Sequence, residues 1–379
     1  MTPAEFASSQ ANEKSRQSVF SCSFSPKKRI AIVSLGAVGG VRTTVSKLIK
    51  GLQLEGFCIN VISFENANLL AKLYSDIANL RELRNFDAVI YMGSIQWPSH
   101  MFMNDDAMVA LFIHGFIRQE LVNAINLGGF RQSLGAMFLL SLWNVFKTIG
   151  KIDLFICRCL TSCEANGIRE NYVLLPEFVF PYEIEFCDKV SKSFEQDCTR
   201  GNKIKVLTYT SYAESPRLLR KPHVISLMRD ASRSVKKEIE LTIIDPKGKN
   251  ESVERVGNLT IRYARFMPKE IFLKELKSSD MFVELCIDEE LRNVSMDVGL
   301  MGTPIAKLTH AKFVERQDYT EDCLIQAESY KGLARKVADY LNDVEHYKPI
   351  YSKNMRDFIL KRRTWDAVKN PLLNRLAKH

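Results

Sequence analysis

Short apolar runs alternate with segments of helical spacing twice along this chain, and this alternation is the strongest restriction on its fold. Residues 29–34 form a continuous apolar run that stops just before a glycine-rich stretch, and residues 41–52 follow with helical spacing. Unbroken runs of this kind are typical of strands buried on both faces of a parallel sheet. Further strands of this first half are expected at residues 58–64, 86–92, 109–114, 154–159 and 172–175.

The same pattern restarts after a polar stretch at residues 188–203, which is predicted to be a linker. Strands are expected at residues 204–210, 238–244, 259–263, 281–286 and 304–307, with helices at 222–237, 268–278, 293–300 and 332–342. Strands that alternate with helices predict α/β domains built on parallel sheets. The chain of 379 residues is long enough for two such domains in series.

Four regions follow from this reading. Residues 1–26 are rich in Ser, Gln and Ala and are expected to be disordered. A first Rossmann-like domain is expected at residues 27–190 and a second at residues 203–345, followed by a helix and basic tail at residues 346–379. Ligands of parallel sheets bind at the carboxyl ends of the strands, so the cleft between the two domains is the expected site.

The positive charge is concentrated in the second half of the chain. The net charge is +9, of which residues 1–190 contribute +1 and residues 191–379 contribute +8. A basic surface favours phosphates, nucleic acid or an anionic membrane. Nucleic acid is not expected as a partner, because the sequence has no motif of interleaved aromatic and basic residues. Residues 134–146 are too short an apolar run to span a bilayer, and with the basic tail they predict loose contact with an anionic membrane surface.

The nine cysteines indicate a reducing, cytoplasmic location. Their number is odd and they are scattered through strand-like segments, so buried thiols are expected and not a disulfide framework. Cys157, Cys159 and Cys163 form C-x-C-x3-C, which lacks the paired spacing of zinc sites. These three are therefore predicted to be core thiols. The N-terminus lacks the charged-then-apolar pattern of a signal peptide.

A glycine-rich turn follows the first predicted strand. Gly39 and Gly40 end this turn and open the next helix. Glycines at such a place let a ligand approach the backbone, and a helix N-terminus favours negative charge. The spacing matches neither the dinucleotide fingerprint nor the P-loop, so a plain strand–helix turn is the alternative.

Two acids stand eight residues apart at the end of another predicted strand. Glu289 lies in the loop after residues 281–286, and Asp297 lies in the second turn of the helix expected at residues 293–300. Carboxylates on both sides of a helix N-terminus can accept hydrogen bonds from sugar hydroxyls while the amides hold a diphosphate. The alternative is a solvated acidic loop.

Basic residues and one histidine also follow predicted strands. Arg217 and Lys221 come after the first strand of the second half, where basic side chains suit a phosphate and ordinary surface charge is the alternative. His114 ends a strand of the first half, where a histidine serves either structure or acid–base chemistry.

Together these motifs resemble the large family of retaining, nucleotide-sugar-dependent glycosyltransferases with the GT-B fold. That family carries E-x7-E followed by a small-residue helix and G-T-P-V, which Glu289, Asp297 and residues 302–305 match in order and spacing. Thr364, Trp365 and Asp366 resemble the family's closing f-s-W-d motif, in the helix that crosses back to the first domain. The likeness extends from about residue 28 to residue 370 and implies two Rossmann-like domains that face each other across a cleft.

The resemblance also implies roles for individual residues. Lys221 and Arg217 would neutralise the donor pyrophosphate, and Asp297 would hold the ribose hydroxyls. The transferred hexose would be contacted by Glu289 and flanked by His114. Gly39 and Gly40 would give the phosphates or the acceptor room. The implied reaction needs no metal, because basic groups and a helix N-terminus take the leaving-group charge. The implied acceptor is a sugar, a lipid-linked sugar or a protein.

The chain departs from the family pattern in three loops. Thr210 and Ser211 replace the glycine that precedes the family's Arg–Lys pair. Glu177-Phe-Val-Phe replaces N-G-V-d, and residues 290–292 replace small residues after the first Glu. These departures leave open a non-catalytic GT-B-like protein that binds a nucleotide sugar or a partner. A different Rossmann enzyme, such as an NAD-dependent dehydrogenase, is a further alternative, with Glu65 as a loose match to its ribose-binding acid.

Overall fold

The computed structural model describes most of both predicted domains. The described residues are 28–35, 40–64, 83–92, 106–113, 137, 141, 152–195, 203–210, 221–245, 251–284, 290–309 and 319–378. The segment expected to be disordered, residues 1–26, lies outside them, and so does most of the apolar segment 134–146.

The first domain is built on a parallel sheet of six strands in the order β2-β1-β3-β4-β5-β6. Its strands are β1 (Arg29–Leu35), β2 (Cys58–Phe64), β3 (Ala88–Met92), β4 (Met108–Ile113), β5 (Leu154–Cys157) and β6 (Tyr172–Leu174). Helix α2 (Gly40–Leu54) follows β1 and helix α7 (Leu160–Ala165) follows β5. Every residue of β3, β4 and β5 is buried, as their continuous apolar runs predict.

The second domain is built on seven strands in the order β13-β12-β11-β7-β8-β10-β9. They are β7 (Ile204–Tyr209), β8 (Ile239–Ile244), β9 (Ser252–Val256), β10 (Leu259–Ala264), β11 (Met281–Glu284), β12 (Ile305–Leu308) and β13 (Ile325–Ala327). The pairs are parallel except for β9, which pairs antiparallel with β10 at the sheet edge. β9 and β13 were not predicted from the sequence.

Helices cover both faces of the second sheet. Those of this half of the chain are α8 (Pro181–Glu195), α9 (Lys221–Ser232), α10 (Lys269–Ser278), α11 (Asn293–Leu300), α13 (Tyr330–Asn342) and α14 (Val344–Arg362). Buried residues of α9 and α13 pack on one face of the sheet. Buried residues of α8, α10, α11 and α14 pack on the other. The fold class predicted from the sequence, α/β with two Rossmann-like sheets, is confirmed.

Helix α8 corrects the prediction of a linker at residues 188–203. The helix continues to Glu195, and its Cys187 and Val190 are buried in the core of the second domain. The exposed face of α8 carries the polar residues that made this stretch resemble a linker, while the helix packs against α10 and α11.

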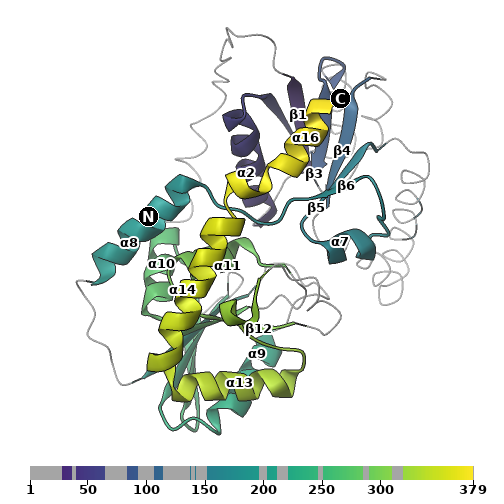
Figure 1. Cartoon of the computed structure of the whole chain (residues 1–379). Helices are drawn as coiled ribbons and strands as arrows, with labels where there is room; N and C mark the ends of the chain where they lie inside the picture. Colours follow the sequence, from purple (N-terminus) through teal and green to yellow (C-terminus); the bar gives the residue numbers. More distant parts are fainter. Residues whose placement is uncertain are drawn as a thin grey trace.

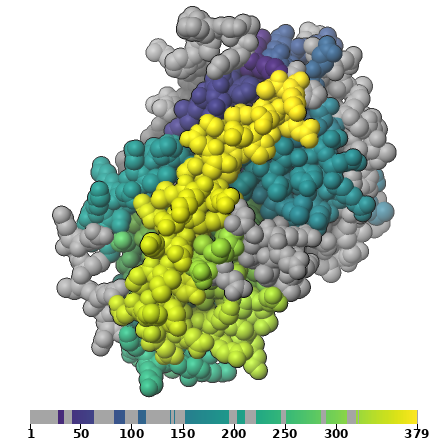
Figure 2. Space-filling view, in the orientation of Figure 1, coloured from purple at the N-terminus to yellow at the C-terminus, as the bar shows by residue number. Residues whose placement is uncertain are grey.

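The chain crosses between the domains twice, and the two crossings are hydrogen-bonded side by side. Val179 donates its backbone N–H to the Arg363 carbonyl at 2.7 Å, and Trp365 donates to the Val179 carbonyl at 3.1 Å. After α14 the chain continues in α15 (Trp365–Val368) and α16 (Asn370–Lys378), which lie on the first domain (Figure 1). Figure 2 shows this C-terminal segment as a continuous yellow band across both domains. The predicted return of the C-terminal helix is confirmed.

Trp365 anchors this return in the core of the first domain. Its side chain is buried among residues of β1, β3 and β4 and lies 5.0 Å from the Phe178 ring, centroid to centroid. Its indole N–H donates to Glu55 at 3.0 Å. A Cβ added to Gly51 of α2 would lie 2.8 Å from the indole ring, so glycine leaves the room that this ring fills.

In the part of the chain that the structure describes, none of the helices has the length and hydrophobicity of a membrane span.

Of the nine basic residues at positions 348–378, four contact acidic or aromatic side chains of the protein itself. Lys348 pairs with Asp280, Arg356 with Asp188 and Lys369 with Glu55, while Arg363 lies over the Phe358 ring. The exposed ones are Lys353, Lys361, Arg362, Arg375 and Lys378.

Removing the Trp365 ring tests the anchor. We expect Trp365→Ala to lower the free energy of unfolding by about 3–5 kcal/mol, because a large buried side chain is lost. Gly51→Ala should lower it by about 1–3 kcal/mol, because the new methyl group overlaps the indole. Urea unfolding followed by far-UV circular dichroism measures both. Ile350→Ala, at a position 44% exposed on α14, is the control and should change the value by about 0.5 kcal/mol or less. Equal effects at positions 350 and 365 would contradict the anchor.

Candidate functional site

The candidate site lies where the carboxyl ends of the two sheets meet. On the first domain, Thr44 and Lys47 lie in α2, which follows β1, and Arg158 follows β5 directly. On the second domain, Glu290 follows β11 and precedes α11. Arg158 Nη1 lies 3.0 Å from Glu290 Oε1, so the two edges are in direct contact. The predicted location, the cleft between two Rossmann-like domains, therefore has polar side chains from both.

Arg158 is the centre of a buried charge cluster. Its guanidinium pairs with Glu177 of the first domain as well as with Glu290 of the second, and it donates to the Thr44 hydroxyl. The Arg158 and Glu290 side chains are 9% and 3% exposed, so little water screens this pair. Removing one partner of a buried pair leaves an uncompensated charge, which costs about 3–5 kcal/mol. The cluster therefore strongly restrains how the domains meet.

Lys47 of α2 links this edge of the first sheet to the segment in which the chain crosses to the second domain. Its ammonium donates to the Phe178 carbonyl at 2.7 Å and lies 3.0 Å from Glu183 in α8. Burial lowers the pKa of Lys47, and the neighbouring Glu183 opposes this shift. Glu177 and Phe178 belong to the stretch that replaces the family's N-G-V-d. Here these residues contribute a buried ion pair and a core aromatic ring.

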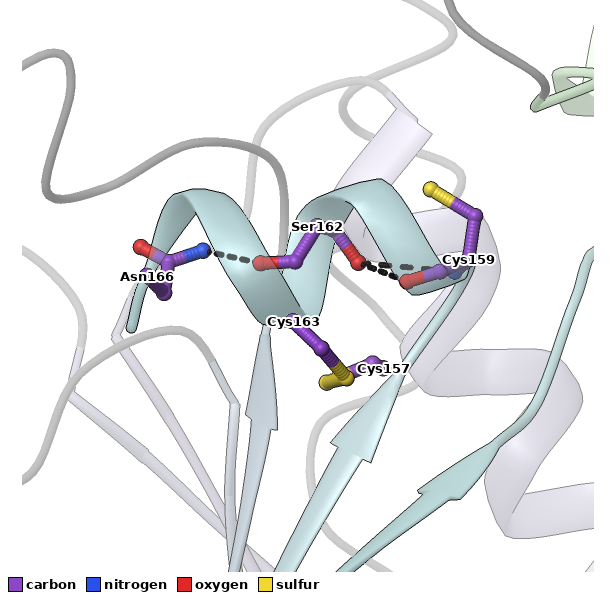
Figure 3. The surroundings of a disulfide bond; sticks show 5 residues. All are labelled: Cys157, Cys159, Ser162, Cys163 and Asn166. Atoms are coloured by element: carbon purple, nitrogen blue, oxygen red, sulfur yellow. Dashed lines mark hydrogen bonds between the residues drawn. A yellow bond between two sulfur atoms is a disulfide. The ribbon is translucent and has the colours of Figure 1, made fainter. Parts of the chain in front are cut away.

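A disulfide holds the backbone from which Arg158 projects. Cys157, the last residue of β5, is bonded to Cys163 in α7, and both are fully buried. Figure 3 shows the Cys159 sulfur directed away from this bond, and Ser162 linked to the backbone of Cys159. The prediction that Cys157 and Cys163 are core thiols is wrong, because the turn from β5 into α7 brings the two sulfurs together. Cys159 is a buried thiol outside this disulfide, as predicted.

Asp297 lies in the second turn of α11, as the sequence predicts. Its side chain forms an ion pair with Lys269, the first residue of α10, and the residue is 9% exposed. Burial and the Asp297 carboxylate raise the pKa of the nearby Cys187 thiol to about 12. It is therefore a largely buried acid on the helix that follows Glu290.

Buried polar contacts fix the beginning of α11. Glu284, the last residue of β11, is fully buried and accepts hydrogen bonds from Arg292 Nε at 2.7 Å and from the Ser295 hydroxyl. Lys307 of β12 is also fully buried, and its ammonium donates to the Glu290 carbonyl at 2.5 Å. The position of the helix that carries Asp297 is thus set from two neighbouring strands.

Lys221 lies at the carboxyl edge of the second sheet. It is the first residue of α9, and its ammonium lies 3.7 Å from Asp245, which follows β8. The same ammonium lies 4.2 Å from the centroid of the Tyr263 ring in β10. The structure therefore places this cation at the carboxyl ends of β8 and β10, which is the side where a parallel sheet binds anionic ligands.

Of the other predicted site residues, the structure describes only Gly40. Glu289, His114, Arg217 and Gly39 lie outside the described residues, and Gly40 is the first residue of α2. Sequence reasoning missed Arg158, Glu177, Lys47 and Lys307. Each is a charged residue in or beside an apolar segment, and a charge at such a place is the sequence signal that could have revealed it. Within the described segments, no three His, Cys, Asp or Glu residues gather as a metal site would require.

Comparisons with known proteins agree on the architecture. No protein-family model and no curated protein matches the sequence. Sucrose-phosphate synthase from Thermosynechococcus elongatus is similar in structure, with a TM-score of 0.62 and 12% identity over 93% of this chain and 100% of that one. HepE from Anabaena, solved with UDP and glucose, has a TM-score of 0.58 and 12% identity over the same shares. WaaG, a glycosyltransferase of lipopolysaccharide biosynthesis, has a TM-score of 0.58 and 12% identity over 91% of this chain and 98% of that one. These likenesses confirm the predicted GT-B fold.

The disulfide can be tested directly by digestion. Trypsin cleaves after Lys151, Arg158 and Arg169, so peptides 152–158 and 159–169 should remain joined without reductant and separate with it. We expect the Cys157→Ala/Cys163→Ala double variant to lose about 2 kcal/mol of unfolding free energy, because a short loop is no longer closed. Cys159→Ala is the control, since that thiol is buried nearby but is not part of the disulfide. Separate alkylated peptides from a non-reducing digest would show that the bond does not form.

Proposed function

We propose that this chain is a glycosyltransferase that moves a hexose from a nucleotide-sugar donor to an acceptor, with retention of anomeric configuration. The observation that carries the proposal is the place of Asp297. It has the spacing of the family's second acid, and it lies at the carboxyl edge of the second sheet, on the helix that follows Glu290, whose carboxylate contacts Arg158 of the other domain. Similar structures support a nucleotide-sugar donor, since HepE was solved with UDP and glucose.

The proposed donor site uses cations and carboxylates of the second domain. Lys221, with Arg217, would neutralise the diphosphate, whose charge grows as the bond to the sugar breaks. Asp297 would accept hydrogen bonds from the ribose hydroxyls while it remains paired with Lys269. Glu289 would contact the hexose, with His114 beside it, and Gly39 and Gly40 would leave room for phosphates or acceptor. No metal is needed in this scheme, because Lys221 and the N-terminus of α11 take the charge of the departing diphosphate.

The proposed acceptor is a sugar, a lipid-linked sugar or a protein. A lipid-linked acceptor would bring the chain to the cytoplasmic face of a membrane. The five exposed basic residues of α14 and α16 support contact with anionic lipid there, since each Lys or Arg near such a surface adds about 1 kcal/mol.

Donor hydrolysis tests the proposed reaction. A panel of UDP-, GDP- and ADP-sugars without added metal should give turnover of one donor by the wild type, and Glu289→Gln should abolish it. Asp297→Asn should raise KM about 10-fold or more, because hydrogen bonds to a charged group are weakened. Lys221→Met should also raise KM about 10-fold or more, because the diphosphate loses its cation.

A control for these variants lies on the same helix as Lys221. Asp230 is in the last turn of α9, at the opposite end from Lys221, and forms an exposed pair with Arg233. Asp230→Asn should leave KM unchanged. Nucleotide-sugar binding by calorimetry without any turnover would indicate instead a non-catalytic GT-B-like binding protein. Neither turnover nor binding would overturn the proposal.

Vesicle binding tests the membrane contact. Sedimentation with vesicles that contain phosphatidylserine should bind more protein than sedimentation with neutral vesicles, and the difference should shrink as salt rises. Lys361→Gln/Arg362→Gln should reduce the anionic binding, because both side chains are exposed. The paired, less exposed Lys348 provides the control substitution, Lys348→Gln. Equal binding to both vesicles would exclude the contact.

A further inference from the structure

We infer that β9 is a dimerisation edge, through which two copies of this chain join the sheets of their second domains by antiparallel pairing of β9 with β9. The partner is a second copy of this chain, because the sequence of this edge is complementary to itself. The inference does not depend on the proposed function.

Strand β9 gains little burial from the fold of a single chain. All five of its residues are exposed, and among the described residues it pairs only with β10, at one end of the seven-stranded sheet. Val253 is 67% exposed, the highest fraction among the large apolar side chains that the structure describes, and Val256 is also exposed. An exposed edge strand with β-branched apolar side chains is a ready surface for the addition of another strand.

The backbone groups of every second residue of β9 face away from β10. The Asn258 and Ala264 carbonyls, at the two ends of β10, accept hydrogen bonds from residues in or next to β8. The even-numbered residues of β10 therefore direct their backbone groups to β8, and the odd-numbered residues direct theirs to β9. These odd-numbered residues lie opposite the even-numbered residues of β9. The N–H and C=O groups of Val253 and Arg255 consequently point to the open side of β9, where a second strand can bind them.

The charges at this edge favour one register for the pair. When two β9 strands are centred on Val253, Glu251 of each copy lies opposite Arg255 of the other, and the two valines lie opposite each other. Centring on Glu254 or on Arg255 instead places like charges opposite each other, which is destabilising. Charged residues on an edge strand commonly prevent indiscriminate pairing. Here they disfavour two registers and support the one that is centred on Val253.

A pair of this kind has twofold symmetry. Each contact therefore occurs twice, and assembly through β9 stops at two copies. The two seven-stranded sheets become one continuous sheet. The contact is short, because β9 has only five residues, so we expect a reversible dimer that forms as the protein concentration rises.

Charge reversal tests the register. Sedimentation velocity over a series of protein concentrations should show the wild-type mass rising from that of one chain, 43.3 kDa, towards twice that value. Glu251→Arg and Arg255→Glu each place like charges opposite each other twice, and each should raise the dissociation constant about 10-fold or more. The double variant restores opposite charges in reverse order and should return the constant to within about 3-fold of the wild type.

Two controls separate this effect from a general change of charge or structure. Arg233→Glu reverses an exposed charge elsewhere in the same domain, in an exposed ion pair, and should leave the dissociation constant unchanged. Arg255→Glu also removes an exposed contact with Glu238, and exposed pairs contribute little to stability. Thermal unfolding of each variant should therefore match that of the wild type.

A single introduced cysteine tests which residues meet. In the proposed register residue 253 lies opposite its own copy, at the Cα separation of about 5.5 Å that is typical of a hydrogen-bonded pair and that a disulfide can span. Val253→Cys should therefore give a disulfide-linked dimer under mild oxidation, seen on a non-reducing gel. Val256→Cys, at another exposed position of β9, is the control and should cross-link no more than the wild type.

The outcomes decide the inference without reference to donor turnover. The mass of a single chain at every concentration overturns it. So does a double variant that dimerises no better than Glu251→Arg or Arg255→Glu alone, because the charges would then not lie opposite each other. Equal cross-linking at positions 253 and 256 overturns it as well.

Discussion

The structure depends on the place where the chain crosses twice between its two domains. The outgoing crossing at Val179 and the returning one at Thr364 are paired like two strands. Phe178, Phe180 and Trp365 surround them with a buried aromatic cluster on the first sheet. Two connections that run side by side join the domains along one line. The relative placement of the domains therefore depends on this paired crossing and on any further contact between the domains that lies away from it.

That second contact is the buried cluster around Arg158. The isolated Arg158–Glu290 pair would be a weak source of stability, because the desolvation of two charges offsets much of their attraction. The pair matters more for the relative orientation of the two domains than for the free energy of folding. An arginine that is already bound by Glu177 and Thr44 accepts Glu290 in one orientation only. With the paired crossing segments on one side and this ion pair on the other, the domains are joined at two separate places.

The architecture could be predicted from the sequence because its signals are local. Local sequence patterns defined β2 and α11 to the residue and most other predicted elements to within a few residues. Asp297 was found because its motif spans only a few residues around one helix. Arg158, Glu177 and Lys47 were missed because each has a partner more than a hundred residues away in the chain. The disulfide was missed because the spacing of Cys157 and Cys163 indicates nothing until a strand turns back into a helix. β9 was missed because all of its residues are exposed.

The departures from the family pattern have a common physical meaning. Where that pattern has N-G-V-d, Glu177 binds Arg158, while Phe178 and Phe180 pack against Trp365. Where it has small residues after the first acid, Glu290 reaches the first domain. Both replacements put larger, buried side chains into loops where the family has small residues. The two departures meet at one cation, because Glu177 and Glu290 both pair with the buried Arg158 guanidinium, one from each domain.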